Sequence, residues 1–437
     1  MDRLKSAFYD KAMSLIAEMK TFNKDNGATI IDQVTIGQVF GGMRGIKSML
    51  WETSLLDADE GIRFRGYSIP ELKVHLPSRG DEPLPEGLFW LMLTGDLPTE
   101  EDVNWLSDEW ERRRQIPEQT FRVLDSLGPE THPMTQLGIG VLSLQHKSEF
   151  ARRYAEGMNK RDYWDATYED AMNLIACLPQ VAAYIYRRSF ADNKQISPDD
   201  KTDWAASFAH MLGITDDPSF ESLMRLYMTI HADHEGGNAS AHAVHLAGST
   251  LSDAYYSFVS GINALAGPLH GLANQEVIKW IFEMVDALGT SKPTAEQIEK
   301  YIRETLEEGK VIPGYGHAVL RMPDPRFLAQ QAFAQKHMPD DDIVQIVWKV
   351  FDIAPKVLGS LGKVSNPWPN VDAHSGAILV HFGLKEYNYY TVLFAVSRAL
   401  GVLASLCWSR ILGLPLERPK SLTYESIKRW VEARKEK

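Results

Sequence analysis

The chain has 437 residues, 44% of them apolar, and a formal net charge of -12, a size that favours two domains or one large domain with a smaller one inserted. The acidic balance and the scattered lysines and arginines argue against a nucleic-acid-binding protein. The two cysteines, Cys177 and Cys407, stand far apart in apolar runs, so we expect a reducing compartment and neither a disulfide framework nor a cysteine metal site.

The first residues, 1–20, have helical periodicity and include Asp2, Asp10 and Glu18. These acids, and the lack of a long apolar run, differ from a secretory signal and from an acid-poor transit peptide. We therefore expect a cytoplasmic protein of bacterial type, or a protein of the mitochondrial matrix from which a presequence has been removed.

Helical signals dominate the rest of the chain, and no series of short alternating strands is found. Capping residues mark the start of two helices. A capping side chain favours a helix start because its oxygen accepts a hydrogen bond from a free N–H group of the first turn. The sequence therefore predicts an all-α fold. The clearest helices cover about residues 168–185, kinked or divided at Pro179, residues 218–230 after the N-cap Asp217, and about 295–308 after the capping box Thr294–Gln297.

Residues 391–408 form the most apolar segment and place Arg398 near its middle. The segment approaches the length of a membrane span, but an arginine at that depth costs roughly 2.5–3.5 kcal/mol on insertion scales. We interpret it as a buried core helix and expect no membrane association. A buried guanidinium needs a partner, and the residues alone leave two open: a distant acid or a bound anion.

Four segments place histidine or aspartate beside glycine and proline: 231–245, 263–274, 311–326 and 366–376. Glycines let backbone amides approach a ligand closely, and prolines keep a turn rigid. Each segment alone is more typical of a structural turn than of a functional site. Together the four segments concentrate reactive side chains beside glycine and proline.

The order and wording of these segments resemble the citrate synthase family, from about Gly41 to Lys420. The resemblance is to the dimeric form typical of mitochondria, which also occurs in some bacteria. It is carried further by GGMRG at 41–45, DEGIRFRGYSIPE at 59–71, LPEGLFWL at 84–91, HPMTQ at 132–136, DHEGGN at 233–238 and LPLERPKS at 414–421.

The resemblance implies a nearly all-helical fold of two domains. A large domain would comprise residues 1–273 and 381–437, and a small helical domain, residues 274–380, would be inserted in it. The small domain would close over the large one after oxaloacetate binds and so protect acetyl-CoA from wasteful hydrolysis.

The resemblance also implies an activity, the condensation of acetyl-CoA with oxaloacetate to citrate and CoA, the first step of the tricarboxylic acid cycle. Asp372 matches the general base that takes a proton from the acetyl methyl group. His270 matches the group that hydrogen-bonds the thioester oxygen and stabilises the enol or enolate. His317 matches the group that polarises and protonates the ketone of oxaloacetate. Such preorganised donors meet the negative charge that a weak carbon acid develops.

Substrate contacts follow from the same resemblance, because planar guanidinium groups suit carboxylates. For oxaloacetate they are His234, Arg326, Arg398 and, reaching across from the partner subunit of a homodimer, Arg418. For coenzyme A they are Arg44, Arg321 and the backbone of residues 311–317, including Gly314 and Gly316. Lys160 or Arg161 stands where many relatives place an arginine, a departure from the family pattern. Acetyl-CoA would be a cosubstrate, with no metal and no tightly bound cofactor.

Three alternative functions compete with this interpretation. A 2-methylcitrate synthase would use the same residues with propionyl-CoA, because one methylene is worth only about 1–3 kcal/mol of discrimination. The spacings His231-x-x-His234 and His242-x-x-His245 could present pairs of imidazoles to a metal, but match no common zinc protease signature. A purely structural role predicts that at least one of His270, His317 and Asp372 is altered, but all three are intact.

Overall fold

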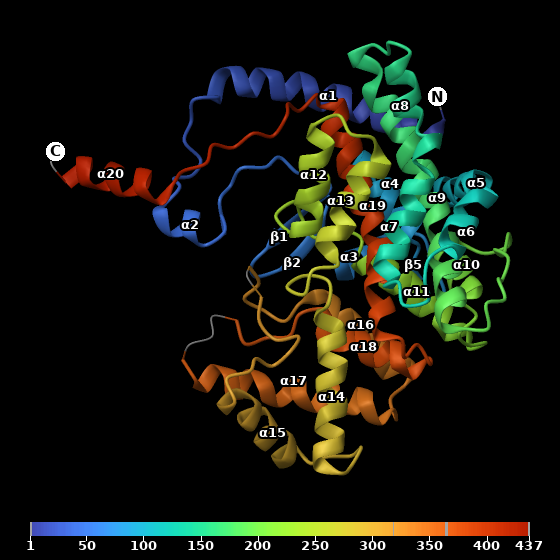
Figure 1. Ribbon diagram of the computed structural model, residues 1–437, viewed down its shortest axis with the longest axis vertical. Coiled ribbons are helices and arrows are strands. Elements are labelled where there is room, and N and C mark those ends of the chain that lie inside the picture. The colour runs from blue at the N-terminus through green and yellow to red at the C-terminus, as the bar shows by residue number, and fades with distance from the viewer. Residues whose placement is uncertain (1, 318, 363–365, 436–437) are drawn as a thin grey trace.

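The computed structural model describes residues 2–317, 319–362 and 366–435. In that part of the chain helices dominate, and strands form only two small antiparallel sheets (Figure 1), in agreement with the predicted all-α fold. The larger sheet has the order β1-β2-β3, with Ser54 opposite Phe64. The strands are β1 (Ser54–Asp57), β2 (Gly61–Phe64), β3 (Tyr67–Ser68), β4 (Ser78–Arg79) and β5 (Glu82–Pro83).

Capping side chains set the predicted helix starts. Asp217 accepts a hydrogen bond from the backbone of Ser219 at 2.8 Å, and Thr294 and Gln297 form a capping box, so the helices predicted there are confirmed. The helices are α1 (Arg3–Asn26), α2 (Ile36–Phe40), α3 (Ile69–His75), α4 (Pro85–Thr94), α5 (Glu100–Arg113), α6 (Glu118–Asp125), α7 (Pro133–Ser143), η1 (Gln145–Lys147), α8 (Glu149–Ala155), η2 (Lys160–Asp162), α9 (Tyr163–Phe190), α10 (Trp204–Leu212), α11 (Pro218–Ile230), α12 (Ala239–Ser249), α13 (Ala254–Leu265), α14 (Ala273–Leu288), α15 (Ala295–Glu307), α16 (Pro325–His337), α17 (Asp342–Ser360), α18 (Asp372–His381), η3 (Tyr387–Tyr389), α19 (Tyr390–Ile411) and α20 (Tyr424–Lys435).

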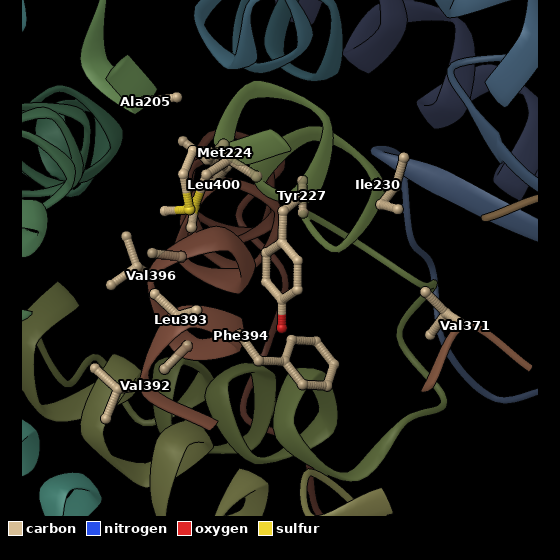
Figure 2. Packing of buried hydrophobic residues seen from close by; sticks show 14 of the residues in the cluster. Ala205, Met224, Tyr227, Ile230, Val371, Val392, Leu393, Phe394, Val396 and Leu400 are labelled. Atoms are coloured by element: carbon tan, nitrogen blue, oxygen red, sulfur yellow. The ribbon is translucent and has the colours of Figure 1, made fainter. Parts of the chain in front are cut away.

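The apolar helix α19 forms the centre of the larger group of helices. It packs against α9, α12, α4 and α11, and Figure 2 shows side chains from α11 and α19 in this core, among them Met224, Tyr227, Val396 and Leu400. The span Tyr387–Ile411 is long and apolar enough to cross a membrane, but its most apolar window is completely buried in the protein. The core helix predicted from its central arginine is confirmed.

Helices α14 to α18 form a second group at the bottom of Figure 1. Within it α14 packs against α18 and α15 against α17, and α16 packs against α18. Helix α16 also contacts α3 and α11 of the larger group. The N-terminal ends of α16 and α18 carry Arg326 and Asp372, so two predicted site residues belong to this second group.

Helix α9 continues through Pro179 from residue 163 to residue 190, so of the two expected outcomes the helix is not divided there, and a kink stays a prediction. Proline has no N–H, and the carbonyl of Ile175, four residues earlier, therefore loses its usual donor. The indole Nε1 of Trp204 on α10 donates to that carbonyl at 3.1 Å instead. A partner from another helix thus satisfies the group that proline leaves free, which sequence periodicity cannot reveal.

This contact leads to a stability prediction. In the variant Trp204→Phe the carbonyl of Ile175 loses its donor inside the core, and we expect the free energy of unfolding to fall by about 1–3 kcal/mol beyond the loss of packing. Denaturant unfolding measures it. Trp164→Phe is the matched control, because Trp164 is also buried and its indole makes no hydrogen bond to the described residues. Equal losses in the two variants would contradict the prediction.

Two segments extend away from the body of the protein, and we call them the N-terminal arm (residues 27–50) and the C-terminal arm (residues 413–435) (Figure 1). They contact each other where the ring of Phe40 meets the ring of Tyr424, with centroids 6.3 Å apart. Large apolar side chains that gather in exposed segments are typical of an interaction site. The exposed large apolar residues of the arms are Ile30, Ile31, Val34, Ile36, Val39, Phe40, Met43, Leu50, Leu416, Leu422, Tyr424 and Trp430.

Candidate active site

The turn after α11 is fixed by the buried carboxylate of Asp233. Its Oδ2 accepts hydrogen bonds from Trp51 Nε1 at 3.1 Å and Ser54 Oγ at 2.8 Å, and also from Thr53. Its Oδ1 accepts from the backbone N–H of His234 at 3.0 Å. Strand β1 and the residues before it therefore hold His234 in place, and the buried Nε2 of His234 has no partner among the described residues.

Arg398 is buried, with 2% of its surface exposed. Its Nε donates to the carbonyl of His231 at 3.1 Å and its Nη1 to the side-chain oxygen of Asn238 at 3.1 Å. Within the described residues no carboxylate forms an ion pair with it, so a distant acid is not its direct partner. Burial lowers the pKa of Arg398 to about 10, and the guanidinium remains charged at neutral pH. A bound anion is the partner that fits.

Arg326 lies beside this position on α16. Its Nε and Nη2 donate to the two carboxylate oxygens of Asp324 at 3.0 and 2.7 Å, and both side chains are buried. Asp324 also caps α16, since its carboxylate accepts from the backbone N–H of Arg326 at 2.9 Å. This bidentate pair fixes the direction of the guanidinium, whose charge lowers the pKa of His234 and of His317 after the larger effect of burial.

His270 is a neutral imidazole at physiological pH, because burial and then the charge of Arg398 lower its pKa to about 4. The backbone N–H of Ser240, in the first turn of α12, donates to His270 Nε2 at 3.2 Å. The Oγ of Ser240 lies 2.9 Å from the same nitrogen. A ring nitrogen that accepts a hydrogen bond carries no hydrogen itself, so this contact assigns the ring hydrogen to Nδ1.

His317 has the opposite tautomer. The backbone N–H groups of Val319 and Leu320 donate to its Nδ1 at 3.0 and 3.1 Å, which assigns the hydrogen to Nε2. Burial, followed by the charge of Arg326, lowers the pKa of His317 to about 4. Its ring lies edge-on to that of His234, with centroids 5.4 Å apart. His270 and His317 are therefore both neutral hydrogen-bond donors, each through a different nitrogen.

Asp372 is the first residue of α18, and the side-chain oxygen of Asn370 accepts from its backbone N–H at 3.0 Å. Burial raises the pKa of Asp372 to about 6, although Arg326 and Arg398 oppose the shift. The carboxyl group makes no hydrogen bond to the residues that the structure describes. It is therefore ionised at pH 7 yet more basic than an ordinary aspartate, which suits a general base.

The loop of residues 311–317 lies against the loop before α18. Gly316 donates to the carbonyl of Trp368 at 2.9 Å, and Asn370 donates to that of Gly314 at 2.9 Å. Gly314 has φ 77° and a Cβ there would lie 2.9 Å from the Cα of Ala373, so only glycine fits. This packing explains Gly314 without a ligand, and a φ of 97° explains Gly316, so their contact with coenzyme A remains a prediction. Ala318, within the predicted segment 311–326, lies outside the described residues.

The cluster combines two guanidinium groups, two neutral imidazole donors and one basic carboxylate, which together can bind a dianion and remove a proton from a carbon acid. Residues 42–420 match the family described as Citrate synthase, C-terminal domain. The chain belongs to the citrate synthase family. It is 55% identical over 416 residues to the mitochondrial citrate synthase of Daucus carota, covering 95% of this chain and 87% of that protein.

Other citrate synthases are also similar to this chain in sequence or in fold. The probable mitochondrial citrate synthase of Glossina morsitans morsitans is 54% identical over 417 residues, which cover 95% of this chain and 89% of that protein. The solved citrate synthase of Pyrobaculum aerophilum has a TM-score of 0.75 at 27% identity, with coverage of 88% of this chain and 92% of that one. That of Thermoplasma acidophilum, solved with carboxymethyl coenzyme A and oxaloacetate, has a TM-score of 0.73 at 24% identity, with coverage of 90% and 96%.

Not every residue assigned from the citrate synthase family joins this cluster. Arg321 does lie near it, since its backbone N–H donates to the carbonyl of Ala58 at 2.8 Å and its charge acts on the pKa of His317. Arg44 and Arg418 are exposed on the two arms. Lys160 begins η2 and, with Arg161, lines a cavity of about 870 Å³ that contains none of the catalytic residues.

Of the two histidine pairs that suggested a metal, the second lies on one helix and the first does not. His231 closes α11 and His234 lies in the following turn, so they do not share a helix face. His242 and His245 lie on α12. Across residues 2–317, 319–362 and 366–435 no group of three or more His, Cys, Asp or Glu side chains is arranged to hold a metal ion.

Three residues of the site escaped the sequence analysis: Asp233, Ser240 and Asp324. Each acts through another residue, by fixing His234, His270 or Arg326. A signal existed for Asp324, because Asp324-Pro325 has the same form as Asp217-Pro218, which correctly predicted a helix start. Asp233 and Ser240 depend on partners about 180 and 30 residues away along the chain, which one sequence cannot place.

Proposed function

We propose that the chain condenses acetyl-CoA with oxaloacetate and hydrolyses the resulting thioester to citrate and CoA. The observation that carries the proposal is the basic carboxylate of Asp372 in a site that also contains two arginines and two neutral imidazoles of opposite tautomer. The names of the curated relatives support it and favour it over 2-methylcitrate synthesis.

The first step is removal of a proton from the methyl group of acetyl-CoA. The Asp372 carboxylate takes the proton, and the electron pair of the C–H bond forms the enol or enolate double bond. Negative charge develops on the thioester oxygen, which His270 Nδ1–H meets with a hydrogen bond. A preorganised donor of this kind contributes about 10²–10³-fold.

The second step forms the carbon–carbon bond. The enol carbon attacks the ketone carbon of oxaloacetate, and the ketone oxygen takes the proton of His317 Nε2 to become the hydroxyl group of citryl-CoA. The proton that Asp372 took from the methyl group then passes to His317 and restores its neutral form. Water adds to the thioester carbonyl, its oxygen becomes part of the new carboxyl group, and one of its protons goes to the sulfur as the C–S bond breaks and CoA leaves as the thiol. These steps use the chain's own residues and its two substrates, with acetyl-CoA as the cosubstrate.

Oxaloacetate would be bound by its two carboxylates. Arg398 has no carboxylate partner in the described residues, and Arg326 is aimed by Asp324, so both are prepared for bidentate contacts. His234, whose Nε2 is buried without a partner, would add a further hydrogen bond. Burial of the charge on Arg398 is otherwise unfavourable, and the bound anion would offset it.

The arms support a homodimer. Their exposed apolar side chains would be covered by a second copy, and the C-terminal arm would carry Arg418 to the active site of the neighbouring subunit. Arg44 and Lys160 lie away from their own catalytic cluster, so any contact with coenzyme A would also cross the interface. Arg321, with Gly314 and Gly316, would contact coenzyme A within one chain.

The two groups of helices would move relative to each other. Asp372, His317 and Arg326 lie in the region 274–380, proposed as the small domain, whereas His234, His270 and Arg398 lie in residues 1–273 and 381–437. Oxaloacetate contacts residues of both, so its binding would draw them together and exclude water. Of the two compartments expected, the names of both relatives favour the mitochondrial matrix.

Release of free CoA thiol from acetyl-CoA and oxaloacetate tests the proposal, with propionyl-CoA as the competing substrate. We expect kcat/KM to be clearly higher for acetyl-CoA. A comparable or higher value for propionyl-CoA would reassign the chain to 2-methylcitrate synthesis, and no thiol release from either substrate would refute the condensation.

A further inference from the structure

The base of the C-terminal arm is tied to α12. The chain leaves α19 at Ile411 and turns at Gly413, which has φ 66°. The buried guanidinium of Arg410 donates to the carbonyls of Gly248 and Ser252 at 2.6 Å each, at the end of α12 and in the turn beyond it. The arm therefore starts from a fixed point on the body of the protein.

Glu417 is the next point of attachment. Its Oε1 lies 2.8 Å from His242 Nε2, and its Oε2 lies 3.9 Å from His245 Nε2. Its backbone N–H donates to Ser249 Oγ at 3.1 Å. These three partners lie on α12 at intervals of three and four residues, so they share one face of the helix. Oε2 is buried and has no hydrogen bond among the described residues.

Arg418 follows directly and behaves differently. It is exposed, and its side chain makes no hydrogen bond or ion pair within the described part of the chain. Residues 419–425 are exposed as well. The contact at Glu417 therefore fixes the last point at which the arm is hydrogen-bonded to the body before it turns away.

We propose that His242 and His245 are positioning residues that aim Arg418, through Glu417, into the active site of the neighbouring subunit. The inference rests on the proposed function, because it assumes that Arg418 of one subunit binds the oxaloacetate of the other. One peptide unit separates Glu417 from Arg418, so a fixed Glu417 restricts where that guanidinium can reach. A preorganised contact loses less conformational freedom on binding.

Helix α12 serves both active sites of the proposed dimer. Its first turn carries Ser240, which contacts His270 of its own active site. Two and five residues later the same helix carries His242 and His245. One rigid element therefore places a catalytic histidine of one site and the anchor for an arginine of the other.

The test compares Glu417→Ala, His242→Ala and Glu417→Gln with the parent protein. A loosened arm weakens the contact of Arg418 with oxaloacetate in both ground and transition states, so we expect KM for oxaloacetate to rise about fivefold or more, with kcat within about twofold. Glu417→Gln keeps an acceptor for His242 and should recover part of the affinity. His381→Ala is the matched control, since it removes a His–Asp contact of 2.8 Å remote from the arm. An unchanged KM for oxaloacetate in Glu417→Ala would overturn the proposal.

Mixed dimers separate the two subunits. In one, a chain carrying both Asp372→Asn and Glu417→Ala is paired with a parent chain, so the only working site receives the loosened arm and KM for oxaloacetate should rise. In the other, Asp372→Asn and Glu417→Ala are on different chains, so the working site receives an intact arm and KM should stay normal. The reverse pattern would overturn the proposal.

Failure of the proposed function would look different, because the parent would then release no thiol. Trypsin cleavage after Lys420 reports on the arm independently of activity. We expect faster cleavage in Glu417→Ala than in the parent and in His381→Ala, and equal rates would overturn the anchoring role of Glu417.

Discussion

Replacement of Asp372 by asparagine is expected to lower kcat by about 10²–10⁴-fold, the usual contribution of a positioned general base. The amide keeps the size of the side chain but cannot accept the methyl proton. In the proposed complex oxaloacetate contacts the arginines and His234 rather than this group, so its affinity should stay near that of the parent. Steady-state kinetics and calorimetric binding of oxaloacetate measure the two quantities.

The pH profile gives a second signature of the same residue. The proposed reaction requires ionised Asp372, so kcat/KM should fall as the pH drops through about 6, the pKa to which burial raises this group. His270 and His317 stay neutral until about pH 4, so they do not produce that limb. A limb that persists unchanged in the residual activity of Asp372→Asn would contradict the assignment.

The contribution of Asp372 to the stability of the folded protein should increase, whereas kcat/KM decreases, as the pH drops through about 6. The pKa of Asp372 in the folded protein is raised above its ordinary value, so the folded state favours the protonated form, and this stabilisation is lost as the pH rises through about 6. A neutral asparagine avoids that loss, and at pH 7 the variant should unfold at the same or a higher temperature. Asp352→Asn, an exposed carboxylate on α17, is the control and should change neither turnover nor stability.

Replacement of Arg398 by methionine is expected to raise KM for oxaloacetate by about 10²-fold or more, because charge-assisted hydrogen bonds are worth about 1.5–3 kcal/mol each. Burial lowers the pKa of Arg398, which means that the folded state disfavours its charged form. Relief of this cost offsets the loss of the hydrogen bonds that Arg398 donates to His231 and Asn238, so the uncharged variant should keep its unfolding temperature without ligand. Oxaloacetate should raise the unfolding temperature of the parent but not that of Arg398→Met, since a ligand stabilises only the state that binds it.

Arg225→Met is the matched control for this variant. Arg225 is also buried, but it is paired with Asp203 at 2.8 Å, and removing one member of a buried pair costs about 3–5 kcal/mol. That variant should lose stability while KM for oxaloacetate stays unchanged. A loss of stability in Arg398→Met as large as that in Arg225→Met, with normal KM, would assign Arg398 a structural role.

The sequence correctly predicted those helices that depend on residues close together along the chain. The cap at Asp217 and the capping box at Thr294 correctly placed helix starts, and the run 391–408 predicted the core helix. The choice between a kink and a division at Pro179 could not be made from local signals, because the carbonyl that the proline leaves free finds its donor in Trp204, a partner from another helix. Asp233 and Ser240, which hold His234 and His270 in place, were not predicted for the same reason, since their contacts form only when distant segments meet.

The candidate site could be assigned by resemblance but not by periodicity. The motifs around His270, His317 and Asp372 indicated their roles, whereas only the packing gave the tautomers and the shifted pKa values. Gly314 shows the limit of the motif, because the close approach of Ala373 explains it without a ligand. The contacts of Arg44, Lys160 and Arg418 involve a second chain in our proposal, and one folded chain leaves them as predictions.

The exposed apolar side chains of the two arms have a consequence for how the protein behaves on dilution. In the proposed dimer these side chains are covered only when two chains meet, so mass action links folding to association. The apparent unfolding temperature should then rise with protein concentration. A dilute assay and a concentrated unfolding experiment would sample different populations of the same protein.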